Sequence, residues 1–213
     1  MKPHERWWTD NWDTQRQKLH DWLTSSQEPS RGMIVQMVDA EYAANHPDGE
    51  YDQPISVLEC GVGFYIDYER YWAARHYVQY HGLDVTPQIV EVGWSRGLTV
   101  WEGSIEAIPC QDNAFDVVYC RHVLEHLPTW HDALLEMLRV ARDRVIVAFF
   151  LLDTENAADR IYYNTVDDVP NTYHNVYSRA NISRWLDDYG YAHLWEPAGT
   201  DWVLAIEPAS QTD

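Results

Sequence analysis

The sequence predicts an α/β fold with a seven-stranded, mostly parallel sheet, helices on both faces of the sheet and an antiparallel hairpin at the C-terminal end. Three observations lead to this prediction. From residue 55 onward, apolar runs of strand length alternate with helical segments. The first run enters a turn with glycines at positions 61 and 63, as a parallel strand does where it meets a ligand. The last two runs are separated by a Pro-Ala-Gly-Thr turn, which suits a hairpin.

Residues 1–50 precede this alternation, and we expect them to form an N-terminal helical extension of the main domain, which covers residues 51–213. Apolar side chains recur there at roughly helical spacing, at Trp7, Trp8, Trp12, Leu19, Trp22 and Leu23. A second short helix is expected over residues 32–44, and the turn-forming residues 46–49 end the extension. The tryptophans either pack this extension onto the core or make it a lid over a ligand.

The main domain is expected to contain five strands before the hairpin. They cover residues 55–59, 82–85, 98–101, 115–120 and 145–150. Helices are expected over 66–80, from Pro87 to a closing Gly97, and over 130–140. An irregular stretch over 151–177 leads to a helix over 181–189, closed by Gly190, and to hairpin strands over 192–196 and 202–207. Such interleaving calls for a parallel sheet covered on both faces.

The chain is strongly acidic. Its 213 residues include 34 acidic and 15 basic side chains, a formal charge of −19. Nucleic-acid binding obtains most of its affinity from cations that neutralise phosphates, so a nucleic-acid substrate is disfavoured. A composition poor in lysine and rich in aspartate also resembles that of salt-adapted proteins, in which acidity is a solvation device. The sequence leaves both explanations open.

The apolar pattern and the cysteines indicate the compartment. No segment reaches the ~18 consecutive apolar residues of a membrane span, and the first ten residues lack the apolar core of a signal peptide. We therefore expect a soluble, cytoplasmic protein with no membrane partner. Cys60, Cys110 and Cys120 are odd in number and show no ligand spacing, so free thiols are expected. The oligomeric state is not readable.

The glycine turn at residues 59–63 is the first chemistry-bearing stretch. Gly61 and Gly63 let a ligand approach the backbone, and the helix that follows offers free N–H groups, although a tight turn without a ligand has the same pattern. Asp84 ends the second strand, where a carboxylate can accept hydrogen bonds from both ribose hydroxyls. A dinucleotide fingerprint would require a third glycine at position 66, which is Ile66.

Several motifs fall in the order and spacing of one family. They are the glycine turn, Gly82-Leu83-Asp84-Val85-Thr86-Pro87, the run from Gly103 to Pro109, the run from Asn113 to Val118, and Val123-Leu124-Glu125-His126-Leu127. Over residues 55–150 the chain resembles the class I S-adenosylmethionine-dependent methyltransferases, particularly the small single-domain ones. The resemblance implies a Rossmann-like fold, S-adenosylmethionine as the cofactor, and methyl transfer.

The resemblance also implies roles for individual residues. Glu59, Gly61 and Gly63 would lie along the methionine part of the cofactor, Asp84 would hold the ribose and Val85 would pack on the adenine. Ser104 and Ile105 would flank the polar edge of the adenine. Arg121 and His122 would face the sulfonium and the acceptor.

Two positions depart from the family pattern. Tyr65 stands where the family usually has a third glycine, and its side chain either intrudes on the cofactor or points away and closes the pocket. Ser104 stands where the family usually has an aspartate that binds the adenine amino group. A serine hydroxyl can still make that hydrogen bond.

Some residues are candidates for proton removal and for lining an acceptor site. Positioning against a sulfonium, which is already an activated electrophile, can supply much of the rate, so a base is optional. The candidate bases are His122, His126 and His174, each with a structural role as the alternative. The candidate acceptor-lining residues are Trp8, Trp12, Tyr163, Tyr173 and Tyr177, for which plain packing is the equal alternative.

The stretch from His122 to His126 also fits the H-x-x-E-H pattern of a zinc peptidase. It follows directly on a buried strand, where the resemblance already accounts for it, so no metal is expected. The expected function is methylation of a small molecule at O, N or C. Tyr65 and Ser104 motivate one alternative, a cofactor-binding or scaffold protein without transfer activity. A nucleic-acid methyltransferase is the other alternative, which the charge disfavours.

Overall fold

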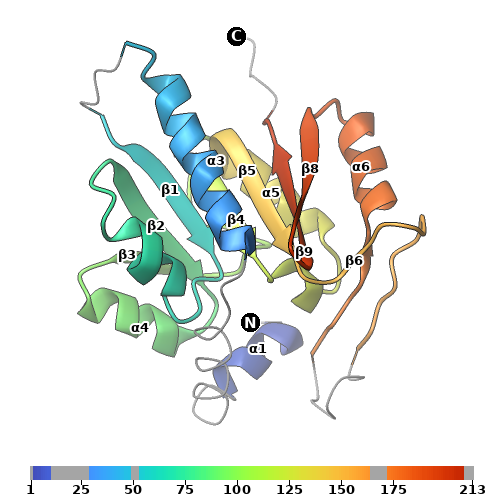
Figure 1. Cartoon of the computed structure of the whole chain (residues 1–213). Helices are drawn as coiled ribbons and strands as arrows, with labels where there is room; N and C mark the ends of the chain where they lie inside the picture. The colour runs from blue at the N-terminus through green and yellow to red at the C-terminus, as the bar shows by residue number, and fades with distance from the viewer. Residues whose placement is uncertain (1, 11–28, 49–52, 164–171, 209–213) are drawn as a thin grey trace.

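The computed structural model describes residues 2–10, 29–48, 53–163 and 172–208. Its centre is a seven-stranded sheet in the order β3-β2-β1-β4-β5-β9-β8 (Figure 1). Neighbouring strands from β3 to β5 pair in parallel, and only β9 runs against its neighbours. The predicted fold class is therefore confirmed, including the single reversed strand at the C-terminal hairpin.

The strands of this sheet are β1 (Ile55–Cys60), β2 (Val78–Asp84), β3 (Thr99–Glu102), β4 (Phe115–Arg121), β5 (Ala141–Phe149), β8 (His193–Ala198) and β9 (Asp201–Ile206). Two short strands, β6 (Leu152–Asp153) and β7 (Tyr177–Ser178), pair separately. The α-helices are α1 (Pro3–Asp10), α3 (Pro29–Asn45), α4 (Pro87–Ser95), α5 (His131–Val140) and α6 (Arg179–Asp188). A π-helical segment, η1 (Tyr68–Trp72), and a 3-10 turn, η2 (Leu124–His126), complete the described elements.

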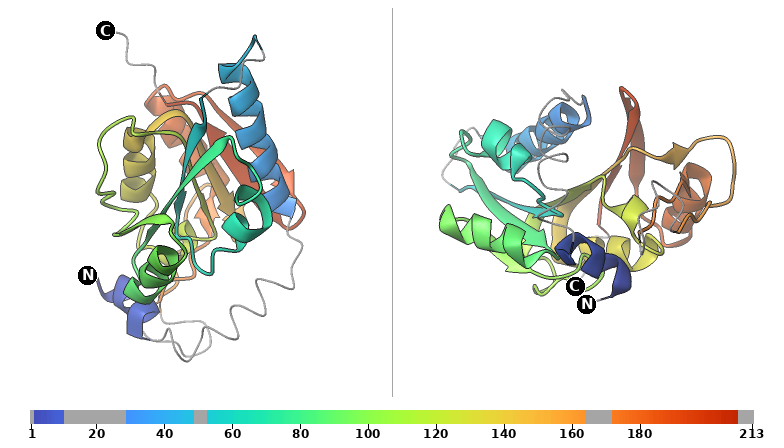
Figure 2. Two further views of the ribbon diagram at one scale, coloured as in Figure 1. Left: turned by 90° about the vertical axis from the view of Figure 1, so that its left-hand side faces the viewer. Right: turned by 90° about the horizontal axis from the view of Figure 1, so that it is seen from below.

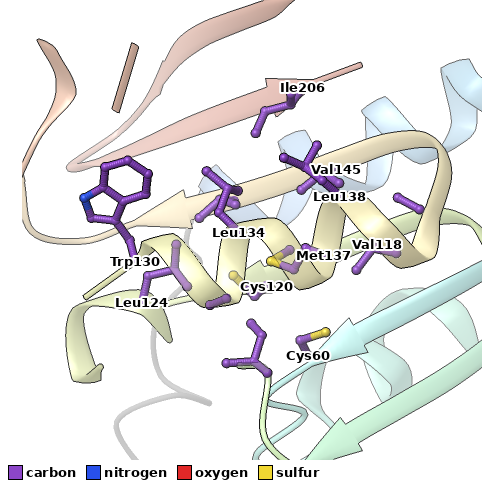
Figure 3. Packing of buried hydrophobic residues seen from close by; sticks show 14 of the residues in the cluster. Cys60, Val118, Cys120, Leu124, Trp130, Leu134, Met137, Leu138, Val145 and Ile206 are labelled. Carbon is purple, nitrogen blue, oxygen red and sulfur yellow. The ribbon is translucent and has the colours of Figure 1, made fainter. Parts of the chain in front are cut away.

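Alternate side chains of the central strands supply two cores. On one face, Leu134 and Met137 of α5 pack with Cys60 and Cys120 of the sheet (Figure 3). On the other face, the apolar stripe of α3 packs on strand residues such as Val57. Figure 2 shows α3 and α5 on opposite sides of the sheet. Because both faces are covered, the central strands are mostly apolar, which is why the sequence revealed them.

One predicted helix was wrong in its second half. The helix expected over residues 66–80 ends at Trp72, and β2 begins at Val78. Strand β2 pairs with the whole of β1, from Ile55↔Val78 to Cys60↔Leu83. This pairing satisfies the backbone groups of residues that local pattern alone assigned to a helix.

The N-terminal extension is described in part. Helix α1 and helix α3 are present, and the latter agrees with the helix expected near residues 32–44. Lys2, just before α1, pairs with Glu106, with 2.7 Å between Nζ and Oε2, and α1 lies near the carboxyl ends of the strands (Figure 1). Whether residues 1–50 act as a lid stays a prediction. No helix among the described residues is long and apolar enough to cross a membrane.

Candidate functional site

The glycine turn after β1 brings the carboxyl ends of three strands together. Gly61 and Gly63 have φ of 79° and 52°, in the left-handed region where glycine is unstrained. A Cβ on Gly61 would lie 2.6 Å from a methyl group of Val123, so only glycine lets the segment after β4 pack here. A Cβ on Gly63 would meet no atom within 4 Å. The turn is therefore closed on the Gly61 side and open beside Gly63.

Asp84, at the end of β2, is tied to this turn. Its Oδ2 accepts a hydrogen bond from Gly63 N at 3.0 Å, and its Oδ1 accepts one from Thr86 N at 2.9 Å. Burial raises the pKa of Asp84, although these backbone bonds oppose the rise. Each carboxylate oxygen can accept a second hydrogen bond. Asp84 thus braces the turn from a buried position beside the open backbone of Gly63.

Glu59 faces the core on the α3 side of the sheet. Its Oε2 accepts a hydrogen bond from the Tyr80 hydroxyl at 2.7 Å. Burial raises the pKa of Glu59 to about 7, against the lowering effect of hydrogen bonds from Tyr80 and Tyr119. The role implied for Glu59 along the methionine part of a cofactor stays a prediction.

The other residues expected around an adenine lie on loops next to Asp84. Gly103 N donates to Asp84 O at 3.0 Å, which joins the loop after β3 to the end of β2. On this loop, Ile105 is buried in the core, and the Ser104 hydroxyl accepts a hydrogen bond from Glu106 N at 3.2 Å. Val85 follows Asp84 and is half-buried. The structure therefore gathers Asp84, Val85, Ser104 and Ile105 at one edge of the sheet.

Tyr65 points away from this edge. Its backbone is left-handed, with φ of 61°, and its side chain is 1% exposed. The hydroxyl donates to Ile89 O at 2.7 Å, within α4, and the ring packs in a cluster with Val62, Val90 and Val100. Tyr65 therefore takes the conformation expected of a third glycine while its side chain fills the space beneath α4.

Gly93 of α4 makes room for Tyr65, and replacing it tests this packing. A Cβ on Gly93 would lie 2.3 Å from the Tyr65 hydroxyl and 2.6 Å from a Val100 methyl group. We expect Gly93→Ala to lower the free energy of unfolding by about 1–3 kcal/mol through overpacking, measured by urea denaturation. Gly32→Ala in α3 is the matched control, because no atom lies within 4 Å of its added Cβ and alanine favours a helix by about 0.5–1 kcal/mol. Equal effects of the two substitutions would contradict this account.

The end of β4 carries a connected set of polar groups from three elements. His122 Nε2 lies 2.8 Å from Asp201 Oδ2, and the Ser30 hydroxyl donates to the same oxygen at 2.6 Å. Arg121 Nη1 lies 3.0 Å from His122 Nδ1 and 3.1 Å from Nε2. Burial opposes ionisation of Asp201, but the bonds from His122 and Ser30 outweigh it and lower the pKa of Asp201.

The other two candidate bases, His126 and His174, lie in the same region as His122. His126 Nδ1 is 2.9 Å from Tyr173 O, and the rings of His126 and His174 meet edge to face with centroids 4.8 Å apart. Burial lowers the pKa of His126 to about 4, so this imidazole is neutral near pH 7. The Phe150 ring lies between His122 and His126, with centroids 4.9 and 5.7 Å away. The structure thus brings all three histidines to one region.

The aromatic residues expected around an acceptor fall into separate groups. Tyr163 and Tyr173 pair, with ring centroids 4.6 Å apart, and Tyr163 is 39% exposed. Tyr177 is fully buried, and its hydroxyl donates to Leu127 O at 2.8 Å, so for Tyr177 the packing alternative applies. The side chain of Trp8 and all of Trp12 lie outside the described residues.

Sequence reasoning missed two members of the polar set at the end of β4. Asp201 opens β9 and Ser30 lies in the first turn of α3. Asp201 is 79 positions from His122, and Ser30 is 171 positions from Asp201. No local pattern marks such residues, because only the order of strands in the sheet places them together.

One cavity lies far from Asp84, and the described residues hold no metal-binding group. A cavity of 520 Å³ lined by Asn45, His46, Asp116, Arg142 and neighbouring residues lies at the amino ends of the strands, the opposite end from Asp84. Among residues 2–10, 29–48, 53–163 and 172–208, no group of three or more His, Cys, Asp or Glu side chains is arranged to hold a metal ion.

Comparison with known proteins identifies the central part of the chain. Residues 58–149 match the family model of a methyltransferase domain. The uncharacterized protein YafE of Escherichia coli (strain K12) is 34% identical over 99 residues, which cover 44% of this chain and 46% of YafE. Ajmaline N-methyltransferase of Rauvolfia serpentina is 27% identical over 124 residues, 52% of this chain and 41% of that enzyme. The aligned part therefore spans less than half the length of these curated relatives.

Solved structures share the fold at low identity. The 1,6-didemethyltoxoflavin-N1-methyltransferase of Burkholderia thailandensis, solved with 1,6-didemethyltoxoflavin and S-adenosylhomocysteine, has a TM-score of 0.66 and 14% identity over 98% of this chain and 91% of that chain. The [4+2]-cyclase SpnF has a TM-score of 0.58 and 15% identity over 81% and 80% of the two chains. These likenesses extend the fold of the domain to nearly the whole chain.

Proposed function

We propose that this chain, whose residues 58–149 match a methyltransferase domain, transfers a methyl group from S-adenosylmethionine to a small-molecule acceptor at O, N or C. The observation that carries this proposal is the link between Asp84 and the glycine turn, where the carboxylate oxygens lie within 3.0 Å of Gly63 N and Thr86 N. The link fixes an acceptor of hydrogen bonds beside an open stretch of backbone, at the crevice where this fold binds ligands.

The residues present fit this cofactor. The space beside Gly63 admits a ligand against the backbone, and Asp84 keeps acceptor capacity for a pair of ribose hydroxyls. Val85 offers an aliphatic surface next to it, and Ser104 offers a hydroxyl for the polar edge of an adenine. Tyr65 leaves the space open because its side chain is buried beneath α4. When bound, the cofactor would supply an electrophilic methyl group, which is bonded to its positively charged sulfur.

A small acceptor is favoured over a nucleic acid. The formal charge of −19 opposes the approach of a phosphate backbone. At and just after the end of β4 lie Arg121, His122 and His126, and the ring centroids of the two histidines are 4.9 and 5.7 Å from that of Phe150. Such a compact set can position a small molecule against the methyl group, and positioning supplies much of the rate. We further propose a cytoplasmic location.

The test is cofactor binding followed by turnover. We expect calorimetry to give measurable affinity for S-adenosylmethionine, and the release of S-adenosylhomocysteine with the low-molecular-weight fraction of a cell lysate. No binding at millimolar cofactor would contradict the proposal. Binding of RNA or DNA that weakens with salt, together with their methylation, would replace the small acceptor by a nucleic acid.

A second candidate function is a protein that binds the cofactor but catalyses no methyl transfer. Two observations favour keeping it: Ser104 stands in place of the usual aspartate, and the same fold occurs in a [4+2]-cyclase. Tight cofactor binding with no release of S-adenosylhomocysteine, whatever the acceptor, would support this candidate.

A further inference from the structure

We propose that His122 is the general base of the transfer reaction and that Asp201 is the positioning residue that holds its imidazole. This inference rests on the proposed function and names the group that takes the acceptor's proton. The acceptor class that follows is a molecule whose O–H or N–H proton must leave as the methyl group is attached.

The first support is the geometry of the pair. His122 Nε2 and Asp201 Oδ2 are 2.8 Å apart, and the two side chains are 10% and 6% exposed. The Ser30 hydroxyl donates to the same Oδ2 at 2.6 Å, which fixes the carboxylate from a third element. A carboxylate that orients a histidine is the arrangement that general bases use in hydrolases of unrelated folds.

The second support is the backbone of His122. Its φ is 58°, in the left-handed region, which is unfavourable for a residue with a Cβ. The residue lies directly after β4, and its neighbour Val123 packs against Gly61 of the glycine turn. The unfavourable backbone therefore belongs to a segment that packs on the glycine turn of the proposed cofactor site, and strained backbone of this kind gathers at functional sites.

The third support is the tautomer that the contacts favour. A neutral imidazole that donates Nε2–H to the ionised Asp201 must have Nδ1 as its acceptor nitrogen. Arg121 Nη1 is nearly equidistant from both ring nitrogens, at 3.0 and 3.1 Å. Because Arg121 Nη1 is as close to one ring nitrogen as to the other, it favours neither tautomer, and Asp201 determines which nitrogen carries the proton.

In the proposed transfer step, one bond forms at the methyl carbon and one breaks. The acceptor heteroatom uses an electron pair to form its bond to the methyl carbon, and the electron pair of the C–S bond remains on sulfur. The proton of the acceptor goes to His122 Nδ1. The imidazolium so formed is stabilised by Asp201, which stays ionised, and it later releases the proton to water.

The charged and titratable groups around His122 come from every neighbouring element. Arg121 lies on β4, Asp201 on β9 and His126 on η2, and the buried Glu125 acts on Asp201 electrostatically. Arg121 opposes protonation of His122 and Asp201 favours it. Removing the carboxylate should therefore shift the titration of His122 to lower pH.

The experiment compares three variants. His122→Gln keeps a side-chain N–H for Asp201 but removes the titrating nitrogen, and we expect the rate of S-adenosylhomocysteine release with the lysate fraction to fall by about 10²–10⁴-fold. Asp201→Asn should lower the rate by about 10–100-fold and shift the acidic limb of the pH profile downward by about one unit. His76→Gln, at an exposed position, should leave rate and profile unchanged.

A second readout needs no acceptor. Nitrogen-15 NMR of the wild-type protein should show His122 with Nε2 protonated and Nδ1 unprotonated when neutral, and Asp201→Asn should lower its titration midpoint by about one pH unit. A neutral Nδ1–H tautomer would overturn the proposal, as would an unchanged midpoint in Asp201→Asn or full activity of His122→Gln.

Cofactor binding separates this inference from the proposed function. We expect all three variants to bind S-adenosylmethionine as the wild type does. If the wild type itself fails to bind the cofactor, the proposed function fails. If the wild type binds and turns over, and His122→Gln does too, only the inference fails.

Discussion

Replacing Asp84 by alanine is expected to weaken S-adenosylmethionine binding by about 1.5–3 kcal/mol, the value of hydrogen bonds to a charged group. From the sequence alone, the same substitution is expected to leave the fold intact. The structure changes that expectation, because Asp84 also accepts hydrogen bonds from Gly63 N and Thr86 N. The two backbone donors are left unsatisfied in the variant, so we also expect the free energy of unfolding to fall by about 1–3 kcal/mol.

Calorimetry with S-adenosylmethionine and urea denaturation measure the two effects separately. Asp84→Asn is the informative companion, because it keeps an oxygen for one backbone donor and loses the charge; we expect it to recover part of the stability and little of the affinity. Asp188→Ala, at an exposed position on α6, controls for the loss of one negative charge. Unchanged affinity in Asp84→Ala would mean that the ribose binds elsewhere.

The sequence predicted the parts of the fold that local pattern determines. Strands β1 and β4 are mostly apolar because helices cover both of their faces, so each stands out as a run between turns. The second half of the helix expected over residues 66–80 was wrong, because pairing with β1 draws Val78 and the residues after it into the sheet. Strand β5 likewise begins at Ala141, four residues before its apolar run.

In the candidate site, too, residues close to one another along the chain were predictable, and contacts between distant elements were not. Gly63 and Asp84 were singled out because they follow two neighbouring strands, and Gly63 N donates a hydrogen bond to Asp84 Oδ2; their role toward a cofactor stays a prediction. The direction of the Tyr65 side chain was not predictable, because it depends on the missing Cβ of Gly93 in a later helix. Asp201 was not predictable either, since β9 reaches His122 only through its insertion beside β5.

Glu125, in η2 just after β4, is expected to make the stability of the protein depend on pH. It is fully buried; its Oε1 accepts hydrogen bonds from Phe150 N at 2.7 Å and Leu151 N at 3.3 Å, while Oε2 has no hydrogen-bond partner among the described residues. Burial raises the pKa of Glu125 to about 8. The carboxyl group is thus protonated in the folded protein near pH 7 and ionised in the unfolded chain.

Whether the free energy of unfolding rises or falls with pH depends on which state, folded or unfolded, binds more protons. Between the unfolded pKa and about 8, the folded state binds the additional proton, so the free energy of unfolding decreases as pH rises through this window. Glu59, with a pKa of about 7, acts in the same direction at lower pH, whereas His126, with a pKa of about 4, acts oppositely between 4 and its ordinary value. Between pH 7 and 8 Glu125 is therefore the main contributor of the three.

We expect the wild type to lose about 1 kcal/mol of unfolding free energy from pH 7 to pH 8, and Glu125→Gln to lose much less. The glutamine keeps a carbonyl oxygen for Phe150 N and cannot ionise. Over the whole range from pH 5 to about pH 9, the variant should consequently lose a few kcal/mol less unfolding free energy than the wild type. Urea denaturation across this range measures it, and Glu91→Gln, at an exposed position of α4, is the matched control. The same slope in wild type and Glu125→Gln would show that another group carries the proton.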